Sequence, residues 1–333
     1  MRIWYDACTG KHLRYGVAIA NRLRGLGHEV TITTRKHPDT IPMMKFLDEQ
    51  ALVVGSYDPE SLLSRLKEGT QRQLSFCRIF GQESPDLAIS HGSADQCRVA
   101  FGLGIPVIST VDTPYAEAVH RLTLPLSNYI VASRSIPKRI LERYNVAAEI
   151  INFDSVDEVA WIKDEKPRAH YGFGHPLIVV RPIEEGAAYT KEKLDLSDLA
   201  NRLTALGNVV YLSRYDRKTI RNLIVPKDFV DSTSLVAQAD LFVGFGGTIT
   251  REAALQGTPA IIIDMFPGQY VNNCLVKKGF PIFRTKKSSA LTLARKLVNK
   301  KYNVKHLLDK LENPADTIAT IVQNNRTETR LNP

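Results

Sequence analysis

The chain has 333 residues, 44% of them hydrophobic and 24% charged, with a formal net charge of +9. The length suggests about two domains, and the composition is ordinary for a soluble globular protein. No apolar run approaches the ~20 residues of a membrane-spanning helix, and residues 1–6 read as a first strand rather than a signal peptide. The sequence therefore argues against an integral membrane protein and favours the cytoplasm.

The sequence carries no recognisable metal or disulfide motif. The four cysteines have no C-x-x-C spacing, and the eight histidines include no H-E-x-x-H pair. We therefore expect no zinc site, no disulfide framework and no bound cofactor. A reducing cytoplasm fits this cysteine usage.

Short apolar runs alternate with helical patterns along most of the chain. The helix after the first strand has apolar residues spaced four, four and three apart, from Tyr15 to Leu26, and Gly27 ends it. The strands expected in the first half are 3–5, 30–33, 52–54, 87–90, 107–110, 129–132 and 149–151. Such alternation predicts a parallel sheet with helices on both faces.

The second half repeats this scheme after a linker. Residues 157–176 combine a charged run with Pro167, Gly172 and Gly174, which is typical of a linker. The strands expected beyond it are 177–180, 209–212, 241–243, 260–263 and 282–283. We therefore predict two doubly wound α/β domains, 1–165 and 166–333, which face each other across a cleft and bind ligands at strand carboxyl ends.

A glycine turn in the second half carries the clearest ligand signal. The buried strand at 241–243 runs into a turn that contains Gly246 and Gly247, and Thr248 stands where a helix N-cap is expected. Glycines allow close backbone approach and a helix N-terminus attracts anions, so the turn predicts a nucleotide diphosphate site. Glu252, about one turn into the helix, is close enough to bond a sugar hydroxyl. The alternative is an ordinary strand-to-helix turn.

Two standard nucleotide motifs are incomplete. A G-x-G-x-x-G fingerprint starting at Gly244 would need glycine in place of Ile249. The run from Thr9 to His12 lacks the upstream glycine and the Ser/Thr of a P-loop. The sequence therefore supports neither a Rossmann dehydrogenase nor a P-loop NTPase.

The positive charge is concentrated in one segment. Residues 277–305 contain ten lysines and arginines and no acidic residue, and without them the formal charge would be −1. The segment is either a solvated face or an attractor of anionic lipid headgroups, a phosphorylated acceptor or nucleic acid. Nucleic acid is disfavoured because no RNP, KH or zinc-finger pattern and no interleaved aromatic residues accompany the charge.

Polar residues near the predicted strand ends are candidates for acid–base chemistry and binding. His91 follows the strand at 87–90, and Asp95 lies in the first turn of the next helix, where a capping or dipole role is the alternative. Glu117 stands four residues before Arg121, a spacing also typical of a surface ion pair.

Two arginines follow strands of the second half. Arg181 comes just after the strand at 177–180, and its planar guanidinium suits a phosphate, with a surface ion pair as the alternative. Arg214 follows the strand at 209–212 and is a second candidate of the same kind.

Four blocks of the sequence resemble a largely archaeal family of unknown function, related to UDP-N-acetylglucosamine 2-epimerases and GT-B glycosyltransferases. They are SHGSADQCRVAFGLGIPVI (90–108), DTPYAEAVHRLTLPLSNYIVAS (112–133), VVRP (179–182) and GGTITREAALQGTPAI (246–261). The resemblance implies a GT-B fold of two Rossmann-like domains. The first would hold the acceptor and the catalytic groups, and the second would bind the nucleotide-sugar.

The resemblance also implies roles for single residues. The diphosphate would lie on Gly246, Gly247 and Thr248, and Glu252 would hold the ribose. In the first domain, Asp95 and Glu117 resemble acidic residues that handle the C2 proton of the sugar in the epimerases. His12 resembles a histidine of the family's N-terminal motif and would act as a base or as a phosphate contact.

The chain also departs from the epimerases. Their arginine-rich motif after the first strand of the second domain is replaced by Arg181-Pro182-Ile183, and their charged loop after the strand at 260–263 by residues 264–270. These departures put 2-epimerisation in doubt and leave nucleotide-sugar binding intact.

The leading hypothesis is a glycosyltransferase that moves a sugar from a nucleotide-diphosphate donor to a hydroxyl acceptor, with His12 or Asp95 as the base. The segment 277–305 would hold it at an anionic membrane that carries a lipid-linked acceptor. One alternative is an epimerase or hydrolase of a UDP-sugar, and another is a non-catalytic nucleotide-binding module.

Overall fold

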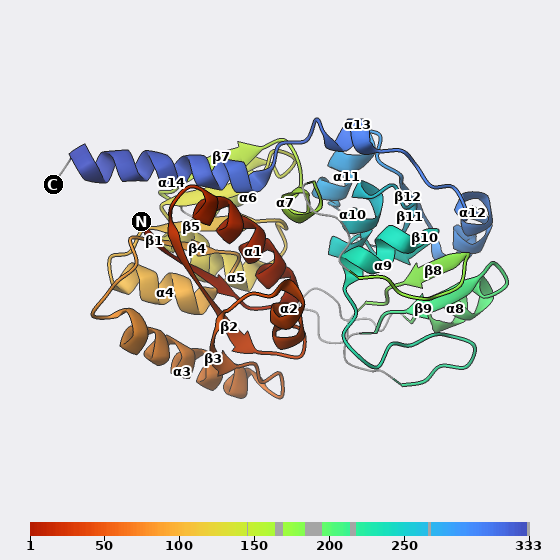
Figure 1. Cartoon of the computed structure of the whole chain (residues 1–333), viewed down its shortest axis with the longest axis horizontal. Coiled ribbons are helices and arrows are strands. Elements are labelled where there is room, and N and C mark those ends of the chain that lie inside the picture. Colours follow the sequence, from red (N-terminus) through yellow and green to blue (C-terminus); the bar gives the residue numbers. More distant parts are fainter. Residues whose placement is uncertain (145, 164–168, 184–194, 214–217, 266–267, 332–333) are drawn as a thin grey trace. The chain divides into compact units, whose positions relative to one another are not determined.

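The chain folds into two compact units in this computed structural model, which describes residues 1–144, 146–163, 169–183, 195–213, 218–265 and 268–331. Unit 1 comprises Met1–Trp161 and the chain from Glu312 onward, and unit 2 comprises Ile162–Leu311 (Figure 1). The chain leaves unit 1 close to the expected boundary after residue 165, but it returns to unit 1 with its last helix. The functional roles expected for the two domains stay predictions.

Unit 1 is built on a seven-stranded sheet in the order β3-β2-β1-β4-β5-β6-β7, and all neighbouring strands are parallel. The strands are β1 (Arg2–Ala7), β2 (Glu29–Lys36), β3 (Leu52–Ser56), β4 (Leu87–Ser90), β5 (Val107–Val111), β6 (Tyr129–Ser133) and β7 (Glu149–Phe153). The helices are α1 (Gly10–Gly25), α2 (Thr40–Leu47), α3 (Leu62–Phe80), α4 (Ala94–Gly102), α5 (Glu117–Thr123), the 3-10 turn η1 (Leu124–Leu126), α6 (Lys138–Glu142), α7 (Val159–Ile162) and α14 (Pro314–Leu331).

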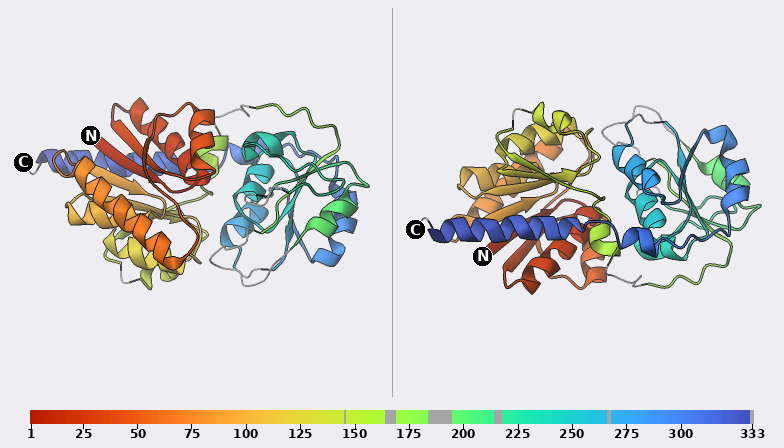
Figure 2. Two further views of the ribbon diagram at one scale, coloured as in Figure 1. Left: turned by 90° about the horizontal axis from the view of Figure 1, so that it is seen from below. Right: turned by 90° about the horizontal axis from the view of Figure 1, so that it is seen from above.

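Helices cover both faces of this sheet (Figure 2). Helices α2 and α14 pack against α1, whereas α3 packs against α4 and α4 against α5. The return of α14 is secured by an ion pair of 2.6 Å between Arg22 Nε and Asp316 Oδ1, and by the Ser155 hydroxyl, which donates to the Glu312 carbonyl. The doubly wound arrangement predicted from the alternating pattern is confirmed for this unit.

The core of unit 1 forms around its central strand. Five of the six residues of β1 are buried, because a parallel strand with helices on both faces has no solvent-exposed side. The Trp4 ring lies 4.8 Å from that of Phe76 and 4.4 Å from that of Phe80, and its Nε1 donates to Thr33 Oγ1 at 2.8 Å. The indole is therefore both packed and hydrogen-bonded, as burial of its polar atom requires.

Unit 2 contains a five-stranded parallel sheet in the order β12-β11-β10-β8-β9. Its strands are β8 (Leu177–Val180), β9 (Asn208–Tyr211), β10 (Leu241–Gly244), β11 (Ala260–Ile263) and β12 (Ile282–Thr285). Its helices are α8 (Ser197–Leu203), α9 (Ser232–Gln238), α10 (Thr248–Leu255), α11 (Tyr270–Lys277), the 3-10 turn η2 (Lys287–Ser289), α12 (Ala290–Leu297) and α13 (Lys305–Leu308). The second parallel-sheet domain predicted from the sequence is thus confirmed.

Each sheet has one point where the strand order reverses direction. In unit 1 this switch lies between β1 and β4, and in unit 2 it lies between β8 and β10. In open α/β sheets, ligands bind outside the carboxyl ends of the strands at such a point. The two switch points are therefore the places to search for a site.

One local prediction needs correction. Thr248 was expected at the N-cap of α10, but the N-cap is Gly247, and Thr248 is the first helical residue. Gly247 has extended backbone angles and no side chain, so no side-chain hydrogen bond caps this helix. The free N–H groups of the first turn are thus left to another acceptor.

A search of the described residues for a helix long and apolar enough to cross a membrane found none.

Candidate functional site

Three side chains of unit 1 meet around the Lys11 ammonium: His91, Asp112 and Asp157. Lys11 lies in the first turn of α1, after β1, while His91 directly follows β4 and Asp112 directly follows β5. The Nζ atom of Lys11 forms an ion pair with Asp112, lies 3.3 Å from Oδ2 of Asp157, and lies 3.2 Å from Nε2 of His91. The sheet topology brings these groups together, because parallel strands end at one edge.

The cluster is largely withdrawn from solvent. The exposed fraction of the side chain is 2% for Asp157, 4% for His91, 17% for Lys11 and 24% for Asp112. Buried charges are tolerated when they are paired and hydrogen-bonded, and here one ammonium serves two carboxylates. Asp112 and Lys11 keep the larger exposed fractions and are the groups that a ligand can reach.

The hydrogen bonds of His91 indicate its tautomer. Its Nε2 faces the Lys11 ammonium, which can only donate, and its Nδ1 lies 2.6 Å from Thr110 Oγ1. Nε2 is therefore the acceptor and Nδ1 carries the proton. Since Thr110 also bonds the Ser90 carbonyl at 3.4 Å, the imidazole is fixed in place from both sides.

The same cluster is where a metal could bind. Ligand atoms of His91, Asp112 and Asp157 lie within 4.8 Å of one another, and imidazole and carboxylate groups are ordinary ligands of divalent cations. The Lys11 ammonium contacts all three residues. A metal would have to displace this ammonium, so the chain itself supplies the positive charge that the carboxylates need.

His12 adjoins this cluster and has an unusual proton affinity. Its ring lies 4.7 Å from that of His91, edge to face, and its Nδ1 has no hydrogen-bond partner among the described residues. Burial first, and then the nearby His91 ring and the Lys11 ammonium, hold the pKa of His12 well below its usual range, and Asp112 acts in the opposite direction. The imidazole is therefore unprotonated near pH 7, as a general base must be, although its lowered pKa makes it a weaker base than a free imidazole.

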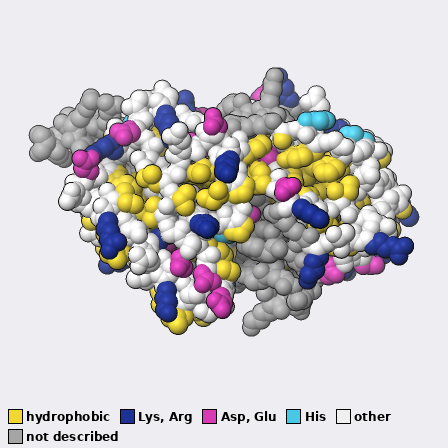
Figure 3. Space-filling view, turned by 60° about the horizontal axis from the view of Figure 1, so that its bottom comes forward, with side chains coloured by type: hydrophobic (Ala, Val, Ile, Leu, Met, Phe, Trp, Pro, Cys, Tyr) yellow, Lys and Arg dark blue, Asp and Glu magenta, His cyan; other side chains and the backbone are white. Residues whose placement is uncertain are grey.

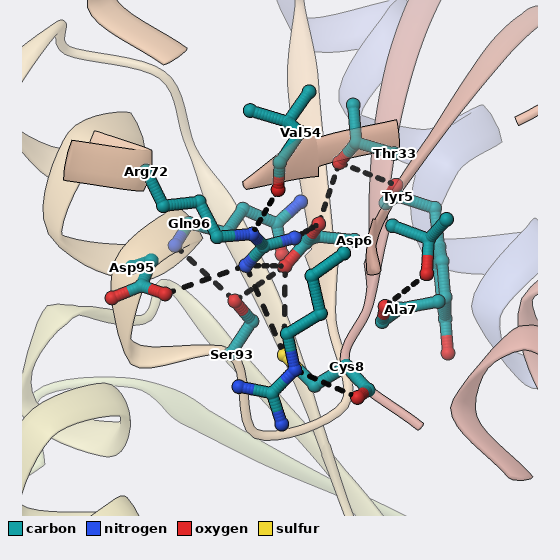
Figure 4. A network of polar contacts seen from close by, with 12 residues as sticks. Tyr5, Asp6, Ala7, Cys8, Thr33, Val54, Arg72, Ser93, Asp95 and Gln96 are labelled. Atoms are coloured by element: carbon teal, nitrogen blue, oxygen red, sulfur yellow. Dashed lines mark hydrogen bonds and ion pairs between the residues drawn. The ribbon is translucent and has the colours of Figure 1, made fainter. Parts of the chain in front are cut away.

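Asp95 takes part in a buried network rather than in the Lys11 cluster (Figure 4). Its carboxylate lies 3.4 Å from Arg72 Nη1 and 3.3 Å from Gln73 Nε2. Arg72 also binds both oxygens of Asp6, at 2.5 and 2.9 Å, and Asp6 accepts from the Ser93 hydroxyl at 2.6 Å. Burial raises the pKa of Asp95, and the charge of Arg72 partly opposes this. The catalytic role of Asp95 stays a prediction.

Glu117 also lies apart from the Lys11 cluster. It is the first residue of α5, and 47% of its side chain is exposed. Its carboxylate accepts from Arg121, Arg143 and Tyr144, each at 2.7 Å. The hydrogen bond from Arg121, together with those other contacts, lowers the pKa of Glu117. Its catalytic role stays a prediction.

Sequence reasoning did not select Lys11, Asp112 or Asp157. The signal for Asp112 was present, because it directly follows a buried strand just as His91 does. Lys11 was considered only as part of a failed P-loop, and Asp157 was taken as the start of the linker. Attention to every polar residue at a strand end would have found Asp112.

The glycine turn of unit 2 leads into a helix whose N-terminus no side chain caps. Gly246 has φ +89°, and a Cβ there would lie 2.4 Å from Gln269 Oε1 and 2.8 Å from Asn272 Nδ2. This glycine is thus required by the packing of α11 against the turn. Gly247 is exposed, and a Cβ at that position would meet nothing within 4 Å. The N-terminus of α10 therefore opens beside Gly247.

Two buried oxygens close to this turn have no partner among the described residues. They are Asn272 Oδ1 and Thr250 Oγ1, and their residues are 1% and 0% exposed. Asn272 Nδ2 donates to the Gly246 carbonyl at 2.7 Å, which fixes the amide. Unpaired buried oxygens are uncommon in folded proteins, so each calls for an explanation.

Glu252 is 1% exposed and joins two helices of unit 2. Its carboxylate accepts from Ser232 Oγ at 2.7 Å and from Thr233 Oγ1 at 2.6 Å, both in the first turn of α9. Its role toward a ribose stays a prediction. A ribose would have to compete with these two hydroxyl groups.

Of the two candidate arginines, only Arg181 lies in the described part of the chain. Arg181 directly follows β8, its N–H donates to the Val243 carbonyl at 2.9 Å, and its Nη1 donates to the Leu212 carbonyl at 2.7 Å. It therefore lies at the switch point of unit 2, as the strand-end rule predicts. Arg214 lies outside the described residues.

Solved structures share the fold of this chain. The UDP-GlcNAc 2-epimerase of Methanocaldococcus jannaschii has a TM-score of 0.68 at 15% identity, covering 97% of this chain and 100% of that one. The UDP-GlcNAc 2-epimerase of Neisseria meningitidis, solved with UDP-GlcNAc, gives 0.66 at 14%, covering 98% and 100%. The glycosyltransferase SnogD of Streptomyces nogalater gives 0.57 at 18%, covering 97% and 99%. The GT-B-like fold expected from the sequence is therefore confirmed.

Sequence comparison identifies the family. The uncharacterized protein MJ0665 of Methanocaldococcus jannaschii is 27% identical over 277 residues, which cover 78% of this chain and 80% of that protein. A family model with the description "Protein of unknown function (DUF354)" matches residues 1–327. The family resemblance carried by the four sequence blocks is thus confirmed, and the chain belongs to the DUF354 family.

Proposed function

We propose that this chain is a glycosyltransferase that moves a sugar from a nucleotide-diphosphate donor to a hydroxyl acceptor. The observation that carries the proposal is the neutral imidazole of His12, whose Nδ1 lacks a partner among the described residues, beside the charged cluster of Lys11, His91 and Asp112. A neutral imidazole in a charged, partly dehydrated site is suited to general-base catalysis.

The proposed chemistry begins with a proton transfer in unit 1. The acceptor hydroxyl gives its proton to His12 while its oxygen attacks C1 of the donor sugar, and the bond from C1 to the diphosphate oxygen breaks. The imidazolium that forms is stabilised by the Asp112 carboxylate, whose charge already favours protonation of His12. We assign the base to His12 rather than to Asp95, because Arg72 and Gln73 occupy the Asp95 carboxylate.

The leaving diphosphate is assigned to the turn in unit 2. The open N-terminus of α10 beside Gly247 offers free N–H groups and the positive end of a helix dipole. Arg181, which follows the neighbouring strand β8, would add a guanidinium, and Glu252 with Ser232 would bind the ribose. Nucleotide-sugar binding is also supported by the N. meningitidis relative in fold, solved with UDP-GlcNAc.

The donor site is tested by thermal shift with UDP, GDP, TDP, CDP, AMP and UDP-GlcNAc. A ligand at about 100 times its Kd stabilises the protein by ~2.7 kcal/mol, which is measurable. Gly247→Ala puts a methyl group where the diphosphate is proposed, so it should abolish the shift. Gly25→Ala is the matched control, because a Cβ at Gly25 also meets nothing within 4 Å. No shift with any nucleotide, or an equal shift in both variants, would refute the donor site.

The base is tested by His12→Gln with the donor that the thermal shift identifies. We expect transfer to fall by about 10²–10⁴-fold while the donor shift persists, because the substitution removes a proton acceptor and leaves the donor site intact. His306→Gln, an exposed histidine of α13, serves as control and should retain activity. Full activity in His12→Gln would reassign the base.

Epimerisation or hydrolysis of a UDP-sugar is the second candidate. The observation that favours it is the presence of two carboxylates, Asp112 and Asp157, on the same ammonium, because C2 chemistry needs groups that remove and return a proton. Incubation of UDP-GlcNAc in deuterated solvent separates the two reactions. Deuterium at C2 would support epimerisation, and sugar transfer without deuterium would support the glycosyltransferase.

We also propose that the basic segment 277–305 draws the protein to an anionic membrane that carries a lipid-linked acceptor. Three of its charges are used within unit 2: Arg284 pairs with Asp264, Lys287 donates to the Asp195 carbonyl at 2.8 Å, and Lys301 donates to the Ala237 carbonyl at 2.6 Å. Its other exposed charges are Lys277, Lys286, Arg295, Lys296, Lys300 and Lys305. On the face shown in Figure 3, the Lys and Arg side chains stand singly rather than in one patch.

Co-sedimentation with vesicles tests this attraction. Vesicles of phosphatidylglycerol should retain the protein at low salt and release it as salt rises, whereas phosphatidylcholine vesicles should not retain it. Arg295→Gln/Lys296→Gln should weaken retention, because it removes two neighbouring exposed charges of α12. Equal binding to both vesicle types would refute an electrostatic attraction.

A further inference from the structure

Unit 1 contains a pocket outside the Lys11 cluster, formed by α5, by η1 and by the end of α6. Its volume is about 410 Å³, and it is lined by Glu117, Arg121, Pro125, Arg143 and Tyr144. This volume lies within the range of small-ligand pockets. None of these residues belongs to the Lys11 cluster.

Three donors in this pocket converge on a single carboxylate. Arg121 Nε donates to Glu117 Oε1, and both Arg143 Nη2 and Tyr144 OH donate to Oε2, all at 2.7 Å. Arg143 also stacks over the Tyr144 ring, 4.8 Å from its centroid, and Tyr144 is only 7% exposed. The pocket thus already binds a carboxylate, which is supplied by its own chain.

The charges of the pocket leave room for a further anion. Two guanidinium groups face one carboxylate, so the lining has one positive charge in excess. Each guanidinium has five N–H donors, of which Glu117 and Tyr144 use only a part. The side chains of Arg121 and Arg143 are 72% and 51% exposed, so their remaining donors can be reached from solvent.

We infer that this pocket binds a small ligand that carries an oxyanion, either a phosphate or a carboxylate, next to hydroxyl groups. The oxyanion takes donors of Arg121 and Arg143, and Glu117 accepts from a ligand hydroxyl. Bidentate binding of planar or tetrahedral oxyanions is the characteristic use of arginine.

The position of the pocket relates it to the Lys11 cluster. His120 of α5 is 4% exposed and packs edge to face on Tyr144, with 5.3 Å between ring centroids. Burial lowers the pKa of His120, and the charge of Asp112 opposes this, so Asp112 acts on the same imidazole that contacts the pocket. The identification of this ligand as the sugar acceptor rests on the proposed function. The claim that the pocket binds an oxyanion does not.

The test is calorimetric titration with glycerol 3-phosphate, gluconate and inorganic phosphate at low, constant chloride. Arg143→Gln should weaken binding about tenfold, because it removes a charge-assisted hydrogen-bond donor. Arg139→Gln is the matched control, since Arg139 is an exposed arginine of α6 outside the pocket lining. The affinity of this variant for the ligand should equal that of the wild type. Binding of gluconate alone would identify a carboxylate ligand, and binding of the phosphates alone a phosphate ligand.

A second variant should raise the affinity for phosphate instead of lowering it. Glu117→Gln removes the carboxylate that competes for the arginines, so inorganic phosphate, which has no hydroxyl-bearing carbon for Glu117 to bind, should bind several-fold more tightly. No titration heat with any of the three ligands, or equal affinities in Arg143→Gln and Arg139→Gln, would overturn the inference. The UDP thermal shift of unit 2 should be unchanged in all three variants. Its loss or absence would therefore count against the proposed function and not against the pocket.

Discussion

The buried ion pair between Asp6 and Arg72 allows a quantitative prediction. Arg72 is 1% exposed, Asp6 is 0% exposed, and the guanidinium also donates to the Val54 carbonyl at 2.8 Å. Arg72→Met keeps an unbranched stem against the Phe76 ring but removes the charge. Removing one partner of a buried pair typically costs about 3–5 kcal/mol, because the other charge stays buried. We therefore expect the folding equilibrium of unit 1 to fall by a factor of a hundred or more.

The assay uses the intrinsic fluorescence of unit 1 during urea unfolding. The two tryptophans of the chain, Trp4 and Trp161, both belong to unit 1 and are buried, so their signal follows this unit. The double variant Asp6→Asn/Arg72→Met should regain most of the loss, because it leaves no buried charge. A loss below about 1 kcal/mol in Arg72→Met would refute the expected cost of an unpaired buried carboxylate.

The stability of the wild type and that of Arg72→Met should change with pH in opposite directions. In the wild type, burial would raise the pKa of Asp6, but Arg72 and the hydroxyls of Ser93 and Thr33 outweigh burial and lower it. The pair therefore stabilises above the unfolded pKa of about 3.9, and this contribution is lost as pH falls through the folded pKa. In Arg72→Met only the hydroxyls of Ser93 and Thr33 oppose burial, so we expect the folded pKa to be raised and stability to fall as pH rises from about 4. The deficit of the variant should thus be smaller at pH 4.5 than at pH 7, and an equal deficit would contradict this account.

Three further predictions concern the candidate sites and Lys301, whose ammonium donates to groups of unit 2. Lys11→Met should destabilise unit 1 by about 2–4 kcal/mol in urea unfolding at pH 7, less at acidic pH, because it leaves Asp112 and Asp157 without their ammonium. Gly246→Ala should lower the melting temperature, since Gly246 has φ +89° and no space for a Cβ, whereas Gly247→Ala should change it little. Burial lowers the pKa of Lys301 to about 8, so the contribution of Lys301 to stability should rise between pH 8 and its unfolded pKa of about 10.4, and Lys301→Met should lose this rise.

The fold was predictable because its signals are local. The central strands β1 and β10 are short, largely apolar runs whose residues are almost all buried, as expected for a parallel strand covered on both faces. The return of α14 to unit 1 was not predictable, because the sequence of a helix does not show which surface the helix packs against. The ion pair from Arg22 to Asp316 joins residues almost 300 positions apart, and either residue alone looks like an ordinary surface charge.

In the candidate site, too, the residue selected from a local sequence signal differs from those selected in another way. His91 was selected from its strand end alone, and it does lie in the Lys11 cluster. Asp95 and Glu117 were selected from a family resemblance, and the structure places them on helices, in contact with Arg72 and with Arg121. A position inside a helix is shifted by a single insertion in the loop before it, so a role transferred by resemblance is easily displaced.

Strand ends are more robust because sheet geometry fixes them. In unit 1 the residue directly after β5 is Asp112, and in unit 2 the residue directly after β8 is Arg181. Both lie at or beside a switch point, where the helices that follow adjacent strands leave in opposite directions and expose backbone and side chains to a ligand. Lys11 and His12, in the first turn of α1, also reach the strand ends, whereas the Glu117 carboxylate is bonded to Arg121, Arg143 and Tyr144. We therefore propose that the reacting groups lie at strand ends and in the first turn of α1, which follows β1, and that Glu117 belongs to the pocket that would hold the substrate.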